Sequence, residues 1–216
     1  MKIKLKKKLQ NVIFLLMLLK MCIVFGQNLS PQKRIVIDVG HGGKDSGAIG
    51  VNGIQEKEVV LNVAKEILKL NKTVLDGKFD IYLTRYRDTL ISLSDRSRLA
   101  KILKADVFVS LHCNHSDNSK ARGIEVYVPN TTSQYSNDCT WLAFELQSAL
   151  KKELGFESRG VKFANFQVLR ETIDNCPSVL LELGFLSNTF ESDYYRNQFG
   201  IRALALVVLD CLLKFR

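Results

Sequence analysis

Apolar runs of strand length alternate with longer segments of helical periodicity along most of the chain, and this alternation limits the possible folds more than any other feature. One periodic segment carries five apolar residues at helical spacing, which form a single stripe: Val60, Leu61, Ala64, Ile67 and Leu68. Strands and helices that alternate in this way form an open sheet covered on both faces. The sequence therefore predicts an α/β fold: a single domain with a central, mostly parallel, about six-stranded sheet flanked by helices on both faces.

The individual elements follow from the apolar periodicity. Six apolar runs are expected to be strands: Arg34–Val39, Phe79–Thr84, Val107–Leu111, Ile124–Val128, Phe166–Arg170 and Ser178–Leu183. Four periodic segments are expected to be helices: Lys57–Leu70, Ser94–Leu103, Asp138–Leu154 and Gly200–Phe215. Trp141 and Phe144, in the third helix, are expected to be core residues rather than a platform for a sugar ring.

The first 26 residues have the composition of an export signal. A lysine-rich head precedes the apolar stretch "VIFLLMLL", and a Val-Phe-Gly before Gln27 offers a small residue at the cleavage point. A membrane anchor is less favoured because Lys20 interrupts a run that is already too short to span a bilayer. A lipid anchor on Cys22 is a further alternative. We therefore predict a signal peptide over 1–26, a polar linker over 27–33 and the folded domain over 34–216.

Signal removal changes the charge of the protein. Residues 1–26 contain six lysines and no acidic residue, so their removal lowers the formal net charge from +9 to +3. Binding to nucleic acid then loses its main support, and no stable membrane insertion is expected. Four cysteines remain without an evident disulfide framework, and whether any of them pair is left open: Cys113, Cys139, Cys176 and Cys211. The last of these falls in an apolar helical run and is expected in the core.

Polar side chains end three of the predicted strands. His41 follows the first strand within the glycine-rich stretch "IVIDVGHGG", His112 closes "DVFVSLH", and Glu182 lies in "PSVLLELGF". In open α/β sheets the reactive groups gather beyond the carboxyl ends of the strands. These three side chains are therefore expected at the same edge of the sheet.

The residue types at this edge allow a metal site. A hydrolytic zinc site needs about three nitrogen or oxygen ligands and an open position for water. His41 and His112 offer two imidazoles, and Glu56, before the first apolar turn of a predicted helix, can turn its carboxylate towards the same edge. Two simpler interpretations stay open: Glu56 can complement the helix dipole, and His41 can hydrogen-bond within its loop. His115 is expected on the loop surface.

Glu182 interrupts an apolar run, where an unpaired carboxylate would cost several kcal/mol or shift its pKa. One interpretation is a structural salt bridge, and the other is a general base beside a metal ion. Asp38 is expected to fix the glycine-rich loop by hydrogen bonds rather than to bind metal.

Five stretches occur in the order typical of one enzyme family: "VIDVGHGGKDSGAIG", "EKEVVLNVAKEI", "LTRYRDTLISLSDRSRLAKILKADVFVSLHCNHSDN", "GIEVYV" and "PSVLLELGFLSN". The chain from about 34 to 213 resembles the zinc-dependent N-acetylmuramoyl-L-alanine amidases, the type-3 amidase catalytic domain. The resemblance implies that residues 34–216 are a zinc amidase catalytic domain, with Zn²⁺ held by His41, Glu56 and His112 and with Glu182 as the catalytic carboxylate. Val39 stands where the family usually has proline, and "LHCNHSDN" carries Cys113 and His115 where small or other polar residues are common.

The resemblance also implies the substrate, which is the peptidoglycan amide that joins N-acetylmuramic acid to the L-alanine of the stem peptide. We expect an exported hydrolase for cell-wall remodelling or daughter-cell separation, located in the periplasm or, alternatively, secreted. A zinc peptidase acting within envelope peptides and a non-catalytic peptidoglycan-binding protein are the competing functions. Family members that act in division often carry an inserted blocking helix, and Pro129–Asn137 is too short for one. A protein activator is therefore not expected to be required.

Overall fold

The computed structural model describes residues 11–17, 32–51 and 53–215. Contacts divide the chain into two compact units, residues 1–32 and 33–216, and the second holds the sheet. Of the predicted signal peptide only a helix over residues 11–17 is described, while the expected cleavage point, Cys22 and most of the 27–33 linker lie outside the described residues. Among the described helices, none has both the length and the apolar character needed to cross a membrane.

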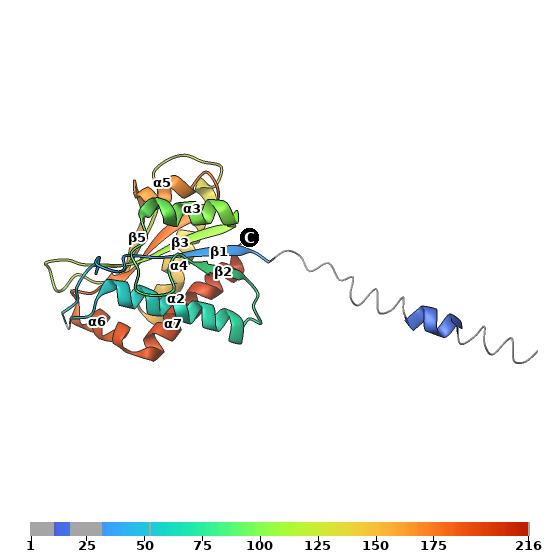
Figure 1. The fold of residues 1–216 in the computed structure, drawn as a ribbon. Helices are drawn as coiled ribbons and strands as arrows, with labels where there is room; N and C mark the ends of the chain where they lie inside the picture. The colour runs from blue at the N-terminus through green and yellow to red at the C-terminus, as the bar shows by residue number, and fades with distance from the viewer. Residues whose placement is uncertain (1–10, 18–31, 52, 216) are drawn as a thin grey trace, which may run out of the picture. The chain divides into compact units, whose positions relative to one another are not determined.

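Six strands form one sheet, in the spatial order β2-β1-β3-β6-β4-β5 (Figure 1). Their bounds are β1 (Arg34–Val39), β2 (Asp80–Leu83), β3 (Val107–Asn114), β4 (Ile124–Pro129), β5 (Ser158–Ala164) and β6 (Ser178–Phe185). Only the β4–β6 pair is antiparallel, and the other four pairs are parallel. The prediction of a mostly parallel six-stranded sheet is confirmed.

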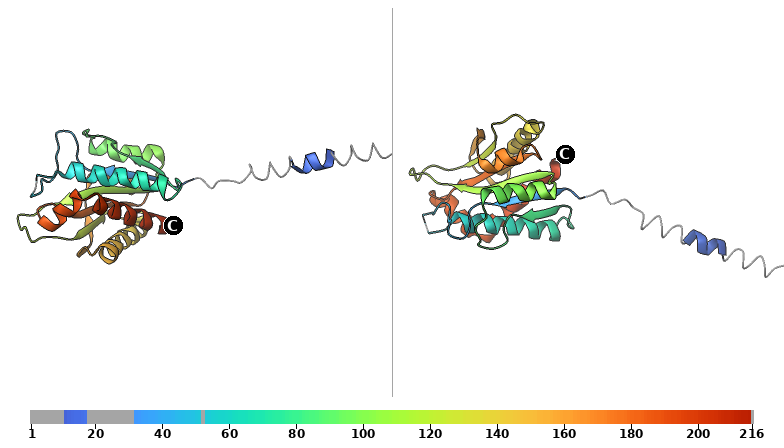
Figure 2. Two further views of the ribbon diagram at one scale, coloured as in Figure 1. Left: turned by 90° about the horizontal axis from the view of Figure 1, so that it is seen from below. Right: turned by 45° about the horizontal axis from the view of Figure 1, so that its top comes forward.

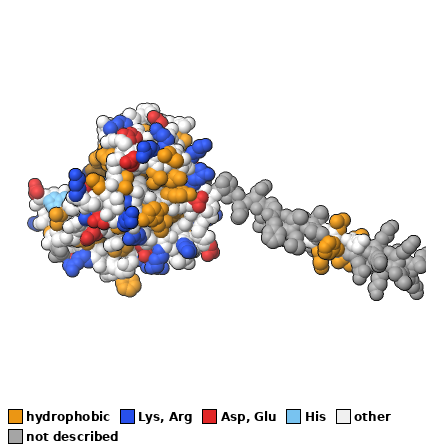
Figure 3. Space-filling model, in the orientation of Figure 1, with side chains coloured by type: hydrophobic (Ala, Val, Ile, Leu, Met, Phe, Trp, Pro, Cys, Tyr) orange, Lys and Arg blue, Asp and Glu red, His pale blue; other side chains and the backbone are white. Residues whose placement is uncertain are grey.

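Helices cover both faces of this sheet, as predicted (Figures 1 and 2). One face is covered by α2 (Glu56–Thr73), α4 (Ser136–Leu154) and α7 (Gln198–Lys214), and the other by α3 (Leu93–Leu103) and α5 (Gln167–Thr172). The short helix α6 (Thr189–Arg196) connects β6 to α7. Figure 3 shows acidic and basic side chains intermingled on the visible face of the domain rather than a large field of one sign.

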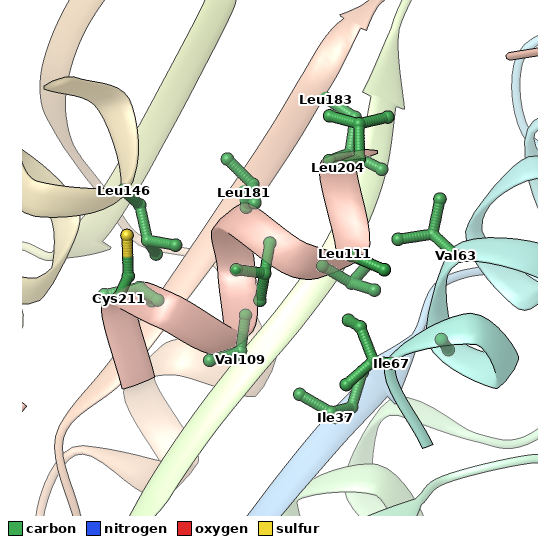
Figure 4. Packing of buried hydrophobic residues seen from close by; sticks show 14 of the residues in the cluster. Ile37, Val63, Ile67, Val109, Leu111, Leu146, Leu181, Leu183, Leu204 and Cys211 are labelled. Carbon is green, nitrogen blue, oxygen red and sulfur yellow. The ribbon is translucent and has the colours of Figure 1, made fainter. Parts of the chain in front are cut away.

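The main core lies between the sheet and the layer formed by α2, α4 and α7. Figure 4 shows Leu181 and Leu183 of β6 beside Leu204 of α7, all of them buried. Burial of one such side chain stabilises a protein by about 1.5–3 kcal/mol. Because side chains alternate along a strand, the neighbours of these leucines, including Glu182, project from the face covered by α3 and α5. This alternation therefore keeps the polar residues away from the main core.

The predicted strand Phe166–Arg170 is wrong, since these residues enter helix α5. The run is short and apolar, a pattern that suits a buried helical turn as well as a strand. Val168 and Leu169 are buried in the smaller core beneath α3. The sixth strand is instead β5 at the sheet edge, where every residue is exposed or half-buried. Backbone pairing with β4 rather than apolar burial forms this strand.

Two further expectations concern the carboxyl-terminal half. Trp141 and Phe144 are both exposed, so their predicted burial is wrong; the Trp141 ring lies 5.7 Å from that of Phe215. Helix α6 was not predicted, and it begins after Asn188, whose side-chain oxygen accepts hydrogen bonds from the backbone N–H groups of Phe190 and Glu191. Such capping satisfies backbone donors that a helix start leaves free.

Candidate functional site

Three side chains from separate elements converge beyond the end of β1. His41 follows β1, Glu56 is the first residue of α2, and His112 lies near the end of β3. The Glu56 Oε1 atom lies 2.9 Å from His41 Nε2 and 2.9 Å from His112 Nδ1. One potential ligand atom from each residue lies within 4.8 Å of the others. The structure thus brings these three predicted residues together in an arrangement that can hold a metal ion.

The Glu56 carboxylate is buried and fixed by backbone donors. The N–H of Cys113 donates to Oε1 over 2.9 Å, and the N–H of Ala48 donates to Oε2 over 2.8 Å. Burial alone would raise the pKa of Glu56, but its hydrogen bonds with His112 and His41 outweigh this and hold the pKa well below its usual range. The carboxylate is therefore ionised at neutral pH, as a metal ligand must be.

His41 has a second partner that the sequence analysis did not select. Its Nδ1 lies 2.8 Å from Asp45 Oδ2, so each ring nitrogen of the imidazole contacts a carboxylate: Nδ1 that of Asp45 and Nε2 that of Glu56. Burial lowers the pKa of His41, while the two carboxylates raise it by a larger amount. A carboxylate on the second ring nitrogen fixes the orientation and tautomer of a metal-binding histidine. The only signal for this role is an acid four residues after His41 in the glycine-rich stretch.

Glycines leave the space that the converging side chains occupy. A Cβ on Gly40 would lie 2.5 Å from His112 Cε1, and one on Gly47 would lie 2.5 Å from Glu56 Oε2. Gly47 also has φ of 62°, a conformation that other residues rarely adopt. Any side chain at either position would displace one of the candidate ligands. This geometry explains why glycine precedes His41 in "VGHGG" and why a further glycine stands at position 47.

A buried network holds the backbone on either side of His41. Asp38 accepts hydrogen bonds from Thr84 Oγ1 at 2.9 Å, Ser110 Oγ at 2.7 Å and Arg96 Nη1 at 3.1 Å. The other end of the Arg96 guanidinium donates to the His41 carbonyl oxygen at 2.9 Å. Asp38 therefore orients the loop through Arg96, in agreement with its predicted role.

A second arginine ties the same loop to the start of α2. Arg85 donates to the carbonyl oxygens of Gly40 at 2.8 Å and Lys57 at 2.7 Å. Asp88 adds a further link, accepting from the Gly43 N–H at 2.7 Å and from Lys57 Nζ at 2.8 Å. These contacts fix the relative positions of His41 and Glu56 before any ion binds.

Glu182 lies on β6 in register with His112 of β3, on the same face of the sheet. Its Oε2 atom is buried and has no hydrogen-bond partner among the described residues. Burial raises the pKa of Glu182 to about 7, although the charge of His112 opposes the shift. None of the ion pairs between described residues involves Glu182, so the predicted alternative of a structural salt bridge is not supported.

The remaining candidates add no side chain to the group formed by His41, Glu56 and His112. His115 is exposed on the loop after β3, as predicted. Four cysteines of the described domain are buried and form no disulfide: Cys113, Cys139, Cys176 and Cys211. The predicted place of Cys211 in the core is confirmed. The sequence analysis also missed Glu125 of β4, a buried carboxylate in register with Glu182.

Comparison with known sequences identifies the relatives of this chain. The family model described as N-acetylmuramoyl-L-alanine amidase matches residues 35–213. The N-acetylmuramoyl-L-alanine amidase LytC of Bacillus subtilis (strain 168) is 43% identical over 161 residues, which are 74% of this chain and 31% of LytC. A probable cell wall amidase, LytH of Staphylococcus epidermidis, is 36% identical over 186 residues, which are 85% of this chain and 58% of LytH. The chain thus spans less than two thirds of these relatives.

Solved structures share the fold over nearly the full domain. An N-acetylmuramoyl-L-alanine amidase from Clostridium difficile 630 has a TM-score of 0.78 and 34% identity, with coverage of 86% of this chain and 97% of that one. The catalytic domain of CwlV from Bacillus (Paenibacillus) polymyxa var. colistinus has a TM-score of 0.75 and 33% identity, covering 86% of this chain and all of CwlV. With the sequence match and the fold in agreement, this chain belongs to the N-acetylmuramoyl-L-alanine amidase family.

Proposed function

We propose that this protein is an exported zinc hydrolase that cleaves the amide between N-acetylmuramic acid and the L-alanine of the peptidoglycan stem peptide. The observation that carries the proposal is the convergence of His41, Glu56 and His112 beside the unpartnered carboxylate of Glu182, in a chain of this family. The assignment of zinc, the roles of the four residues and the substrate are parts of the proposal.

The residues present fit a zinc ion. Two imidazoles and one carboxylate form a nitrogen and oxygen ligand set that leaves room for a further ligand, as hydrolytic zinc sites require. A bound zinc ion supplies a Lewis acid that polarises a carbonyl group and activates water at neutral pH. His41, oriented by Asp45, and His112 would bind it together with the ionised carboxylate of Glu56.

Glu182 would move the proton that amide hydrolysis requires. With a pKa of about 7, its carboxylate can accept a proton from the attacking water as oxygen bonds to the substrate carbonyl carbon. The same group can then deliver that proton to the nitrogen of L-alanine when the carbon–nitrogen bond breaks. The products are the lactyl carboxylate on the glycan and a stem peptide with a free amine.

Mass spectrometry of digested muropeptides tests this function. Purified protein that has been supplied with zinc is expected to release peptides that begin with L-alanine, together with peptide-free glycan. Cuts within the stem peptide would identify a zinc peptidase instead. Binding to peptidoglycan without any cut would identify a non-catalytic binding protein.

The proposed setting is the cell envelope. The predicted signal over residues 1–26 supports export, with the periplasm as the expected location, secretion as the alternative, and cell-wall remodelling or daughter-cell separation as the role. No protein activator is proposed, because only a short loop joins β4 to α4 and no helix lies within it. One similar protein, the CwlD amidase from Clostridioides difficile, 26% identical, was solved in complex with the GerS lipoprotein.

A further inference from the structure

A row of polar side chains crosses four neighbouring strands from the candidate metal centre to the sheet edge. His112 of β3 is in register with Glu182 of β6, and Glu182 is in register with Glu125 of β4. Paired residues of neighbouring strands project from the same face. On β5, Arg159 and Lys162 both contact the Glu125 carboxylate. Because neighbouring strands lie about 4.8 Å apart, the backbone of β5 lies roughly 10 Å from that of β6, and the two cationic side chains extend from β5 towards Glu125 on the strand between them.

Glu125 holds the two cations in place. Its side chain is 4% exposed, and its Oε1 atom pairs with Arg159 Nε and, at 2.8 Å, with Lys162 Nζ. The other oxygen, Oε2, accepts from Tyr127 Oη at 2.7 Å and from Asn114 Nδ2 at 3.2 Å. Burial raises the pKa of Glu125, but these donors outweigh it and lower the pKa to about 2. The carboxylate is therefore ionised, and both of its oxygens have partners within the cluster.

The cations, by contrast, reach solvent. The side chains of Arg159 and Lys162 are 39% and 40% exposed. The Arg159 guanidinium lies over the ring of Phe185, 4.9 Å from its centroid, which restricts its orientation. Arg159 also lies where the β4–β5 register shifts, in a bulge of the kind that redirects side chains near active sites.

Arg159 and Lys162 have positive charge and N–H donors that their contacts within the chain do not use. One buried carboxylate compensates two cations, and the neighbouring Arg122 has its own partner in Glu157. A guanidinium carries five N–H donors and an ammonium three. Among the described residues, Arg159 uses Nε on Glu125 and Nη1 on the Arg122 carbonyl oxygen, while Lys162 bonds to Glu125. Arg159 and Lys162 therefore retain unused donors on partly exposed side chains, with one positive charge more than Glu125 neutralises.

We propose that Arg159 and Lys162 bind a carboxylate of the stem peptide, on its second or third residue after the scissile amide. This inference rests on the proposed function, which places the amide at Glu182. An extended peptide advances about 3.3–3.6 Å per residue, so two to three residues span the distance to β5. Purely structural ion pairs would instead stabilise the sheet edge without any influence on substrate choice.

Matched substrates separate these two cases. The probes are synthetic muramoyl peptides that carry either a free carboxylate or a carboxamide at the second or the third residue. The wild-type protein is expected to favour the carboxylate form by about 10-fold in kcat/KM at one of the two positions, mainly through KM, since a hydrogen bond to a charged group is stronger than one to a neutral group.

The double variant Arg159→Gln, Lys162→Met should bring this preference close to one, with the loss concentrated on the carboxylate substrates. The matched control is Lys69→Met, Arg202→Gln. These residues pair with another buried carboxylate, Glu66, between α2 and α7 on the opposite face of the sheet. The control variant should keep the full preference.

Each outcome decides between the hypotheses. Cleavage by the wild type without any preference, or a preference that the double variant retains, would overturn this inference and leave the proposed function intact. Failure of the wild type to cleave either member of any pair would overturn the proposed function itself. If thermal melting shows that the double variant is poorly folded, Lys162→Met alone decides the question, because Arg159 keeps its pair with Glu125. The preference of this single variant for the carboxylate substrate should be about threefold lower than that of the wild type.

Discussion

At the scale of single residues, Glu182 combines three features that rarely occur together. It is a carboxylate with a buried oxygen that lacks a hydrogen-bond partner, its pKa is raised to about 7, and it lies in register with His112. An unpartnered buried polar atom is costly to the fold. The proposed role in proton transfer would account for a carboxylate at a position where a leucine would suit the strand better.

Glu182→Gln keeps the shape of the side chain but removes its ability to accept a proton. Bound zinc should stay at the wild-type level, while turnover of muropeptides falls by roughly 10²–10⁴-fold. Zinc content by atomic emission and initial rates by chromatography measure the two effects. A near-normal rate in this variant would mean that the base is another residue.

The histidines can be tested by metal content alone. His41→Ala combined with His112→Ala removes two of the three proposed ligands, so zinc binding should fall from about one ion per chain to almost none. His115→Ala is the control, since this exposed histidine lies outside the cluster and its removal should leave zinc content unchanged. Full occupancy in the double variant would contradict the proposed site.

Glu125 gives a pH-dependent test of stability. Its pKa is about 2 in the folded protein against an ordinary value of 4.5, so its stabilising contribution is complete above pH 4.5 and is lost as the pH falls towards 2. Glu125→Gln should lower the free energy of unfolding by about 1–3 kcal/mol near neutral pH, with a smaller difference in acid. Urea denaturation across this range measures it, and Glu153→Gln, an exposed surface acid, should show no such trend. A difference independent of pH would refute the linkage.

At the scale of elements, burial decided what the sequence could predict. The central strands β1, β3 and β6 are buried on both faces and stand out as apolar runs, which made them easy to predict. Edge strand β5 forms by backbone pairing and has exposed side chains, so its pattern was missed and α5 was taken for a strand. The site residues show the same contrast: His41 follows an apolar strand and His112 and Glu182 interrupt apolar strands, whereas no apolar run marks Asp45 or Arg159.

The loop between β1 and α2 tests how closely the backbone must approach His112. Gly40→Ala would place a Cβ 2.5 Å from His112 Cε1 and 2.8 Å from the Leu111 carbonyl oxygen. Overpacking of this kind costs about 1–3 kcal/mol, and it should weaken zinc binding together with stability. Gly53→Ala is a control for strain without a clash: no atom lies within 4 Å of a Cβ there, but φ is +73°, so this variant should lose stability and keep the zinc affinity of the wild type. Equal zinc affinity in the Gly40→Ala variant and the wild type would show that the ring can move aside.

At the scale of the whole molecule, hydrogen bonds within the chain hold the loop that carries His41: Arg85 donates to the Gly40 carbonyl oxygen and Arg96 to that of His41. The short connection between β4 and α4 contains no helix that could cover the candidate ligands. Both features support an open site.

The purified mature chain should therefore digest intact sacculi by itself, with less than about a twofold increase when envelope extract is added. Release of soluble stem peptides measures the rate, and extract alone is the blank. Negligible activity that rises many-fold with extract would reveal an activator.

The four buried cysteines have a consequence for how the protein can be made. Burial raises the pKa of Cys139 and Cys176 to about 11 and that of Cys211 to about 12, and it raises the pKa of Cys113 as well. Thiolates, which carry out disulfide exchange, are thus scarce at neutral pH. No disulfide joins the four cysteines of the described domain. We therefore expect the domain to fold when it is produced in a reducing bacterial cytoplasm.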